Sequence, residues 1–244
     1  MPKMRIDKLL SNMGYGSRKE IKSDAKNGII TLNGNQIKDV SAQVDTETDE
    51  IKYMDEIVKY REYIYIMMNK PQNVVSATED NYDETVIDLL PHELQVFEPF
   101  PVGRLDKDTE GFLLITNDGK LAHNLLSPKK HVDKTYFAKI IGAPLTEKDV
   151  LKFKKGVTFK DHSYTCLPAE LEILNTNDIS ECKITIKEGK FHQIKRMFEA
   201  IDREVIFLKR LTMGPLKLDE TLELGDFREL NEDELTLMKP YMSK

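Results

Sequence analysis

The unbroken apolar run at residues 112–115 (FLLI) restricts the fold of this chain more than any other feature of its sequence. A strand with one face in water alternates apolar and polar residues, so this continuous run predicts a strand that is covered on both faces. Residues 117–119 (Asn-Asp-Gly) follow and predict a turn with a residue suited to positive φ. Asp106 comes shortly before the run, and we therefore expect its carboxylate on a short loop attached to a rigid strand.

Length and composition indicate an ordinary globular protein. The chain has 244 residues, enough for one large domain or for a large and a small one. No apolar run approaches the roughly 18 residues of a membrane span, and the first residues, MPKMRIDKLL, lack the core of a signal peptide. Cys166 and Cys182 are the two cysteines, which suggests neither a disulfide framework nor a zinc site. We expect a cytoplasmic protein that binds no membrane.

Charge is separated along the chain. The net charge of −6 argues against a nucleic-acid partner. However, residues 1–38 hold eight Lys and Arg against three Asp and Glu, a net charge of +5, and residues 39–60 hold two against seven, a net charge of −5. Residues 183–217 (nine against four) and 218–244 (three against eight) repeat this contrast. Phosphate binding depends on local basic surface rather than on the sum, so an RNA or DNA partner remains open.

The amino-terminal segment predicts a compact module of two helices and a small sheet. Apolar residues at helical spacing predict a first helix over 6–13, ended by the glycines that follow. Ser17, with Glu20 three residues later, predicts a capping box at the start of a second helix that ends near residue 27. Asn33-Gly34-Asn35, between IITL and residues 36–40, predicts a β-hairpin.

This module resembles the small RNA-binding domain of the ribosomal protein S-four type. The resemblance covers about residues 3–50 and rests on the pattern R-x-D-K-x-L…S-R-K and on TLNG. It implies RNA contact through a basic helical face, for which the candidate residues are Arg5, Lys8, Ser17, Arg18, Lys19 and Lys22.

The remainder of the chain predicts a second, larger domain, with a boundary near residue 60. Strands are expected at 63–68, 112–116, 135–141 and 182–187, and helices at 84–90, 118–126, 146–155 and 190–200. Because strands and helices do not alternate regularly, we expect an α+β domain on a mostly antiparallel or mixed sheet with flanking helices. The predicted organisation is thus a 1–60 RNA-binding domain and linker, followed by a larger domain over 61–244.

Several kinds of chemistry fit the sequence poorly. His123, His131 and His192 are too scattered for a metal site, and there is no nucleophile elbow, P-loop or GxGxxG. A glycosidase needs a second catalytic carboxyl group, and nothing selects Asp108 or Glu110 for that role. What remains is one carboxylate, an aromatic hydroxyl and a set of basic residues.

Residues 103–119 (GRLDKDTEGFLLITNDG) and 188–198 (EGKFHQIKRMF) resemble the pseudouridine synthases. With HVDKTY at 131–136 and the amino-terminal module, the chain is most similar to the group that modifies small-subunit ribosomal RNA. The resemblance implies that a specific uridine of 16S ribosomal RNA is converted to pseudouridine without cofactor or metal. It also implies ribosomal RNA or the assembling small subunit as the partner, and we expect a monomer.

The resemblance assigns roles to individual residues. Asp106 matches the catalytic aspartate, Tyr136 matches the active-site tyrosine, and Lys195 matches a basic residue that pairs with the aspartate. Lys190 stands where many members have arginine, so it keeps the charge but not the bidentate fork. The candidate RNA-binding residues of this domain are Arg104, Lys190, His192, Gln193 and Arg196.

The isomerisation breaks the bond from C1′ to N1, rotates the uracil and joins C1′ to C5. A carboxylate at Asp106 could attack the sugar, attack the pyrimidine ring or assist glycal formation, and Lys195 would keep it ionised. Arg104 could stack in the gap left by a flipped nucleotide. Other readings stay open: Tyr136 as a core aromatic, Lys195 on a solvated helix face, large-subunit ribosomal RNA as the substrate, or a silent RNA-binding assembly factor.

Overall fold

The computed structural model describes residues 3–242, which divide into two compact units. The first unit contains the chain up to Ile64 and also Leu90–Pro99, and the second contains Tyr65–Leu89 and the chain from Phe100 onward. Over the described part of the chain, none of the helices has the length and apolar character needed to cross a membrane.

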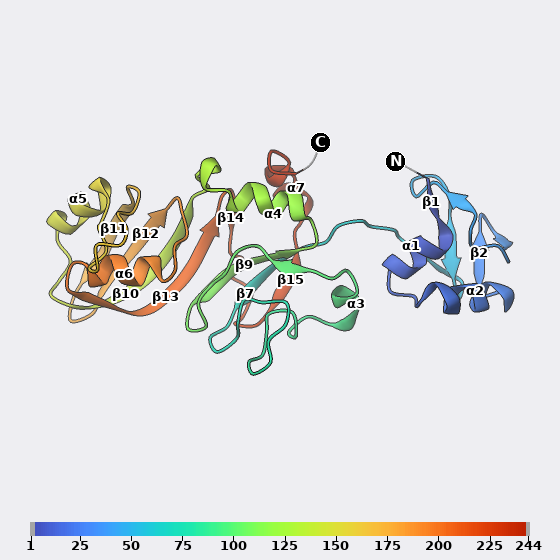
Figure 1. The fold of residues 1–244 in the computed structure, drawn as a ribbon, viewed down its shortest axis with the longest axis horizontal. Helices are drawn as coiled ribbons and strands as arrows, with labels where there is room; N and C mark the ends of the chain where they lie inside the picture. Colours follow the sequence, from blue (N-terminus) through green and yellow to red (C-terminus); the bar gives the residue numbers. More distant parts are fainter. Residues whose placement is uncertain (1–2, 243–244) are drawn as a thin grey trace. The chain divides into compact units, whose positions relative to one another are not determined.

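The first unit is built from short helices and two small sheets (Figure 1). Its helices are α1 (Ile6–Asn12), α2 (Arg18–Lys26) and α3 (His92–Gln95). Its strands are β1 (Met4–Arg5), β2 (Ile30–Leu32), β3 (Asn35–Gln36), β4 (Gln43–Val44), β5 (Ile51–Tyr53) and β6 (Glu56–Ile57). The strand order is β3-β2-β5-β6 in one sheet, and β1 pairs with β4 in the other. A core of Ile6, Leu9, Leu10, Ile21, Ile30 and Ile51 joins these elements.

The local predictions for this unit are confirmed. Ser17 caps α2, and the Glu20 side chain returns to the backbone N–H of Ser17 at 2.8 Å, which completes the capping box. Asn33 and Gly34 have φ of +48° and +79° and form the two-residue turn between β2 and β3. The second strand of the hairpin is shorter than predicted, because pairing ends at Gln36 and the chain then turns to bury Val40.

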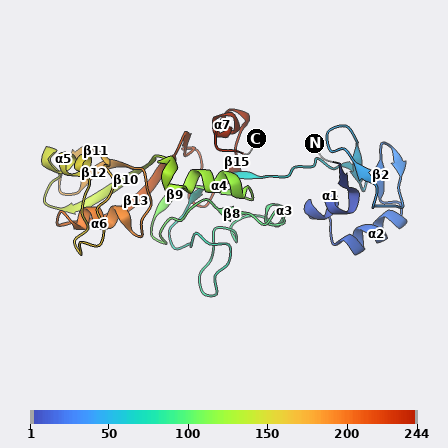
Figure 2. The same cartoon turned by 45° about the horizontal axis from the view of Figure 1, so that its top comes forward.

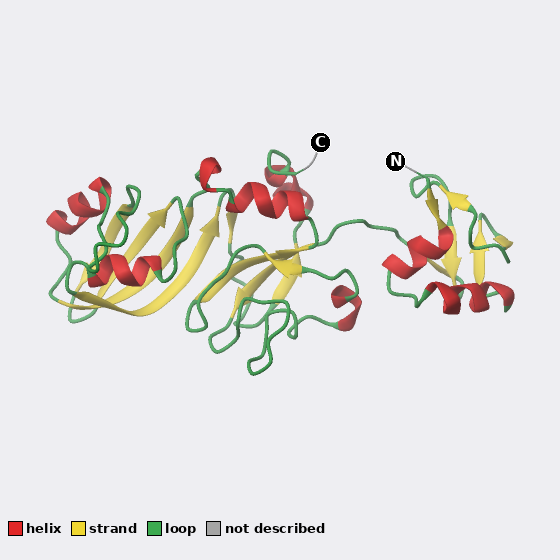
Figure 3. Cartoon of the chain, viewed as in Figure 1, coloured by secondary structure: helices red, strands yellow, loops and turns green. Residues whose placement is uncertain are grey.

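The second unit is built on a nine-stranded mixed sheet, as the α+β prediction requires (Figure 3). Its strands are β7 (Tyr65–Lys70), β8 (Phe100–Pro101), β9 (Glu110–Thr116), β10 (Lys134–Gly142), β11 (Glu170–Thr176), β12 (Ser180–Ile186), β13 (Arg203–Met213), β14 (Leu216–Lys217) and β15 (Phe227–Glu229). The central order is β11-β12-β10-β13-β9-β7-β15. Its helices are α4 (Gly119–Leu126), α5 (Glu147–Lys155), α6 (Gln193–Glu199) and α7 (Glu232–Met238), with a 3₁₀ turn η1 (Pro128–Lys130).

A short parallel contact joins the two halves of this sheet. β13 pairs with β9 only through Lys209↔Glu110 and Arg210↔Gly111, whereas the other neighbours along the central order pair antiparallel. Gly111 has a φ of +101°, and a Cβ atom at this position would collide with the carbonyl oxygen of Arg210. Glycine is therefore required where the two halves meet.

Both faces of β9 are covered, as its continuous apolar run predicts. All seven of its residues are buried, and Phe112 to Ile115 are fully inaccessible. Phe112 and Leu114 share one core with Leu121 and Leu125 of α4 and with Met238 of α7.

The β11–β13 half of the sheet is covered on one face. Residues 134, 136, 138 and 140 of β10 are buried, and the intervening residues 135, 137, 139 and 141 are half-buried. On the covered side, Phe153 of α5 and Phe198 of α6 pack with ring centroids 5.0 Å apart. A side chain at an even position of β10 therefore points into the layer between the sheet and these helices.

Two predictions in this unit are wrong. Residues 84–90 form a turn rather than a helix, because Asp88 accepts hydrogen bonds from the backbone and hydroxyl of Thr85 at 2.8 Å and closes it. This turn is packed against the chain after β7, since the N–H of Val86 donates to the carbonyl of Val75 at 3.0 Å; the long loops of this unit are seen in Figure 2. Residues 117–119 do not form a turn with positive φ, because Asp118 caps α4 and Gly119 is its first residue.

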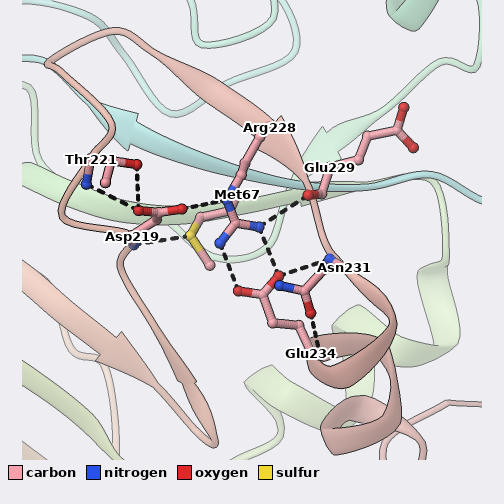
Figure 4. Close-up of polar contacts among 7 residues, drawn as sticks. All are labelled: Met67, Asp219, Thr221, Arg228, Glu229, Asn231 and Glu234. Carbon is pink, nitrogen blue, oxygen red and sulfur yellow. Dashed lines mark hydrogen bonds and ion pairs between the residues drawn. The ribbon is translucent and has the colours of Figure 1, made fainter.

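A cluster of ion pairs fastens the carboxyl-terminal segment to the sheet (Figure 4). Arg228 of β15 donates to Asp219 at 2.6 Å and to both oxygens of Glu234 at 2.8 Å. Hydrogen bonds from Thr221, together with the contact from Arg228, lower the pKa of Asp219 to about 2. Asn231 caps α7 within the same cluster, so β15 and α7 are held in one arrangement.

Candidate active site

Asp106 lies on the loop between β8 and β9, and that loop is fixed by hydrogen bonds from the segment after β7. The Ser76 hydroxyl donates to the carbonyl of Leu105 and accepts from its N–H, each at 3.1 Å. The N–H of Asn73 donates to the carbonyl of Lys107 at 2.8 Å. The predicted placement of Asp106 on a short loop before a rigid strand is confirmed.

Lys70, the last residue of β7, lies beneath this loop and is fully buried. Its ammonium group donates to the carbonyl oxygens of Pro71 at 2.9 Å, Thr109 at 3.1 Å and Asp106 at 3.3 Å. Burial lowers the pKa of Lys70 to about 8, against the opposing effect of the nearby carboxylates, of which Asp108 is the strongest. The loop that presents Asp106 is thus closed around a buried cation.

Helix α6 brings Lys195 to the loop. The Lys195 ammonium lies 3.2 Å from Oδ2 of Asp106, as predicted, but its shorter contacts, 2.6 and 2.8 Å, are with Asp108. Burial acts to lower the pKa of Lys195, but the hydrogen bond to Asp108 and the charge of Asp106 outweigh it, so the pKa is raised. Lys195 therefore stays charged and neutralises two carboxylates.

His192 contacts Asp106 from the other side. Its Nε2 lies 3.7 Å from Oδ1 of Asp106, and its backbone has a φ of +50°. A non-glycine residue in this conformation costs of order 1–3 kcal/mol and persists only where its surroundings hold it. Asp106 keeps 29 % of its side chain exposed between Lys195 and His192, so a ligand can reach the carboxylate.

Strand register places Tyr136 two strands away from Gly111, which lies near the start of the strand that follows the Asp106 loop. Tyr136 pairs with Arg210 across β10 and β13, and Arg210 pairs with Gly111 of β9. Since neighbouring strands lie about 4.8 Å apart, the backbones of Tyr136 and Gly111 are about 10 Å apart. Tyr136 is 7 % exposed and lies on the covered face. The site thus combines a carboxylate on a loop and an aromatic ring on the adjoining sheet.

Two buried cations neighbour Tyr136 in the sheet, Arg210 across from it on β13 and Lys134 two residues before it on β10. Arg210 is 2 % exposed and donates from Nε to the carbonyl of Phe112 at 2.7 Å, while its Nη2 has no hydrogen-bond partner among residues 3–242. Lys134 donates to the carbonyl of Val132, and burial together with the charge of Arg210 lowers its pKa to about 8. Tyr136 thus has two basic side chains as neighbours within the sheet.

Two residues predicted to contact RNA are engaged by other residues of the protein. Gln193 is 4 % exposed, and its amide is occupied by the backbone N–H of Lys190 and by the Glu188 carboxylate, each at 2.9 Å. Arg196 lies over the ring of Phe159 at 3.8 Å and donates to Asp161 at 2.8 Å. The Gln193 side chain is thus committed to internal contacts, whereas Arg196 keeps 27 % of its side chain exposed and stays a candidate for RNA contact.

The other predicted residues of this unit are accessible. Arg104 is exposed on the Asp106 loop, and Lys190 is exposed with its ammonium 4.6 Å from the centre of the Tyr164 ring. Over residues 3–242, no cluster of three or more His, Cys, Asp or Glu side chains has the arrangement of a metal site.

The predicted RNA-binding residues of the first unit are all exposed, but two of them are engaged within the protein. Arg5 forms a bidentate pair with the buried carboxylate of Asp7, with contacts of 2.7 and 3.0 Å. The Ser17 hydroxyl donates to Glu20 in the capping box. Lys8 of α1 and three residues of α2 remain as outward-pointing cations: Arg18, Lys19 and Lys22.

Lys70 and Asp108 are site residues whose roles the sequence did not reveal. Lys70 ends a strand that is otherwise apolar, and a lysine at a covered position is the one available signal. The role of Asp108 depends on the reach of Lys195 from a helix 87 residues away in sequence, which no local pattern records.

Comparison with known proteins gives two family matches. Residues 64–200 match the family described as RNA pseudouridylate synthase, and residues 4–51 match the S4 domain. The chain is 53 % identical, over 96 % of its length and 98 % of the relative, to an uncharacterized RNA pseudouridine synthase YtzG of Bacillus subtilis (strain 168). It is 37 % identical (95 % and 98 % covered) to ribosomal small subunit pseudouridine synthase A of Vibrio vulnificus (strain CMCP6). It is 35 % identical (96 % and 95 % covered) to ribosomal large subunit pseudouridine synthase B of Bacillus subtilis (strain 168).

Proposed function

This chain belongs to the RNA pseudouridine synthases, and we propose that it converts a uridine of 16S ribosomal RNA to pseudouridine with Asp106 as the reacting carboxylate. The observation that carries the assignment of Asp106 is its position: a partly exposed carboxylate on a fixed loop, 3.2 Å from the ammonium of Lys195. A charged, positioned carboxylate is what cleavage of the C1′–N1 bond requires.

The reaction rearranges one nucleotide, and its atoms balance. The bond from C1′ to N1 breaks, the uracil turns, and C1′ bonds to C5. C5 then loses its proton, and N1 gains one. Three routes suit Asp106: attack on C1′, attack on the pyrimidine ring, or assistance to glycal formation. In each route Lys195 places its positive charge 3.2 Å from the carboxylate, and Lys70 holds the loop that carries it.

Tyr136 is proposed to stack on the target uracil, with its hydroxyl near the C5 proton. Tyr136→Phe keeps the ring, so we expect RNA affinity to be unchanged and the single-turnover rate to fall by about 100-fold, the lower end of the range for general acid–base groups. The measurement is the rate of pseudouridine formation at saturating enzyme. A phenylalanine variant as fast as the wild type would leave the hydroxyl without an acid–base role.

RNA binding by this chain involves the S4 domain. We propose that the exposed cations of α2 contact phosphates. Replacing Arg18, Lys19 and Lys22 together by alanine should weaken RNA binding and flatten its salt dependence. The slope of log K against log salt should fall by up to about 0.9 for each phosphate that the variant no longer neutralises. A salt titration of affinity measures both effects.

A matched control removes three exposed lysines from α5 of the second unit: Lys148, Lys154 and Lys155. This variant removes the same amount of charge and should keep the wild-type slope. If both triple variants flatten the slope equally, the effect is one of total charge, and α2 has no particular part in binding.

The choice of 16S ribosomal RNA is supported by the Vibrio vulnificus relative and opposed by the Bacillus subtilis large-subunit relative of nearly equal identity. The test is to map pseudouridines in ribosomal RNA from cells with and without this gene, and to assay the purified protein on 16S and 23S transcripts. We expect one position of 16S RNA to lose its modification. Loss of a 23S position instead would overturn the choice of RNA and leave the enzyme class unchanged.

A further inference from the structure

Phe191 is an aromatic ring in water beside the candidate catalytic carboxylate. It is 76 % exposed, although it lies within a segment whose neighbours Glu188 and Gln193 are both buried. Single exposed apolar residues are common on proteins and need no explanation by themselves. The position of this ring and the way it is held are what set it apart.

The ring of Phe191 is stacked on the imidazole of His192. The ring centroids are 3.8 Å apart and the planes are inclined by 19°. His192 in turn reaches to 3.7 Å from Asp106. One face of the phenyl ring is thus covered by the imidazole that touches the carboxylate, and the ring lies one layer further from the reaction centre.

The loop that presents Phe191 is fixed from the protein interior. The Gln193 side chain accepts from the backbone N–H of Lys190 and donates to Glu188, which also accepts from the Tyr164 hydroxyl at 2.7 Å and from the backbone of Leu167 at 2.9 Å. These bonds close the loop on both sides of residue 191. Exposure of the ring therefore belongs to an ordered loop and not to a loose one.

The charge around Phe191 selects the kind of ligand. Two exposed cations, Lys187 and Lys190, lie within four residues of it in sequence, whereas Glu188 is the one acidic residue over 187–196 and is buried. A flat apolar ring among cations suits a nucleobase with its phosphates, because bases stack on aromatic rings whatever their sequence and phosphates pair with the lysines.

We infer that Phe191 is a base-stacking subsite for a nucleotide next to the target uridine. This neighbouring nucleotide is not base-paired when the RNA is bound. This inference rests on the proposed function and names a further part of the same substrate. Extruding a uridine from a stem or loop unstacks its neighbour, and Phe191 supplies a new stacking partner separate from Tyr136.

The test compares three substitutions in the full chain: Phe191→Ala, Phe191→Leu and Phe191→Trp. The substrate is a transcript of the ribosomal RNA that the wild-type enzyme modifies. Alanine and leucine should each raise KM about tenfold while the single-turnover rate at saturating RNA stays within about threefold, and tryptophan should restore the wild-type KM. Leucine is the matched control, because it keeps an apolar side chain and removes the aromatic face.

A second readout reports stacking directly. A stem–loop RNA that carries the mapped uridine is made with 2-aminopurine at the nucleotide on its 5′ or 3′ side. For the probe on one side of the uridine, binding of the wild type or of Phe191→Trp should lower the 2-aminopurine fluorescence. Binding of Phe191→Ala or Phe191→Leu should lower it less. If leucine behaves like phenylalanine in KM and fluorescence, or if alanine changes neither, the subsite is overturned.

The two proposals fail in different ways. If the wild-type protein modifies no ribosomal RNA, the proposed function fails before any variant is compared. If the wild type is active and Phe191→Ala impairs only the modification of RNA assembled with ribosomal proteins, the ring docks against protein and the base-stacking inference is overturned alone.

Discussion

Asp106→Asn is expected to abolish pseudouridine formation, with a fall of at least about 10⁴-fold in the single-turnover rate, as removal of the reacting group gives in other covalent catalysts. The substitution keeps the shape of a side chain held by Lys195 and His192 and removes only its charge and nucleophilicity. RNA affinity should stay nearly unchanged, because neither the S4 domain nor the basic loops are altered. Rates are measured with enzyme in excess over RNA, and affinity by direct titration.

Asp108→Asn is the matched control for this variant. Asp108 shares Lys195 with Asp106 and makes the shorter contact, at 2.6 Å, but its side chain is 67 % exposed. If Asp106 reacts and Asp108 only helps to place Lys195, the Asp108 variant should lose less than about tenfold, or 1.4 kcal/mol of barrier. Residual activity of Asp106→Asn within about tenfold of wild type would falsify the assignment, most sharply if Asp108→Asn were the inactive variant.

Lys70→Met is expected to lower activity by about 100-fold while changing the free energy of unfolding by less than about 2 kcal/mol. The burial that lowers the pKa of Lys70 to about 8 makes its charged form costly by on the order of 3 kcal/mol. The hydrogen bonds of this ammonium to loop carbonyls offset that cost, and methionine removes both effects. Activity suffers because the Asp106 loop loses its anchor, and a displacement of about 1 Å can slow a reaction about 10²-fold.

The same variant predicts a pH dependence of stability with a definite sign. The pKa of Lys70 is about 8 in the folded chain and 10.5 in the unfolded one, so between these values the unfolded chain holds more protons. The contribution of Lys70 to stability therefore rises as pH increases through this window. Urea unfolding gives the free energy of unfolding of the wild type minus that of Lys70→Met. This difference should be larger at about pH 10 than at about pH 7.5, by on the order of 2 kcal/mol.

Lys107→Met is the control in the same loop. Lys107 is half exposed and pairs with Asp83 at 2.6 Å on the surface, so its removal should change activity and stability little. If Lys107→Met lowered activity as much as Lys70→Met, the buried position of Lys70 beneath the loop would not explain the loss of activity. A difference between wild type and Lys70→Met that stays flat with pH would contradict the assigned effect of burial.

Local patterns predicted the elements that depend on neighbouring residues. The capping box at Ser17, the Asn33-Gly34 turn and the fully covered strand over Phe112–Ile115 are all set within a few residues of chain. The predicted helix over 84–90 is wrong because the apolar residues of this segment suit a helix, whereas the side chain of Asp88 closes a turn. Strands β11 and β13 were overlooked, although the alternation in ELEILNT is typical of a half-covered strand.

The site was predictable only in part, because several of its contacts join residues that are far apart in sequence. Asp106, Tyr136 and Lys195 were identified by resemblance to a family, and their roles await the experiments above. The contacts of Lys70 with carbonyl oxygens up to 39 residues away depend on how β7 and β9 pair. The contacts of Arg196 depend on Phe159 and Asp161, which lie more than 30 residues away in sequence. Side-chain type shows what a residue can bind, and tertiary packing decides whether that capacity is already occupied.

Leu90–Pro99 belongs to the amino-terminal unit although it lies in the middle of the chain. Within that unit Arg61 lies over the ring of Phe97 at 5.0 Å, and Val96 fills the space beside Gly14. The RNA-binding module is therefore not a cassette that can be excised or transplanted at one junction. A chimera that exchanged only residues 1–60 would leave a decapeptide fitted to a module that is no longer there, with Val96 deprived of its contact beside Gly14. A fusion or deletion of this chain must carry both pieces together.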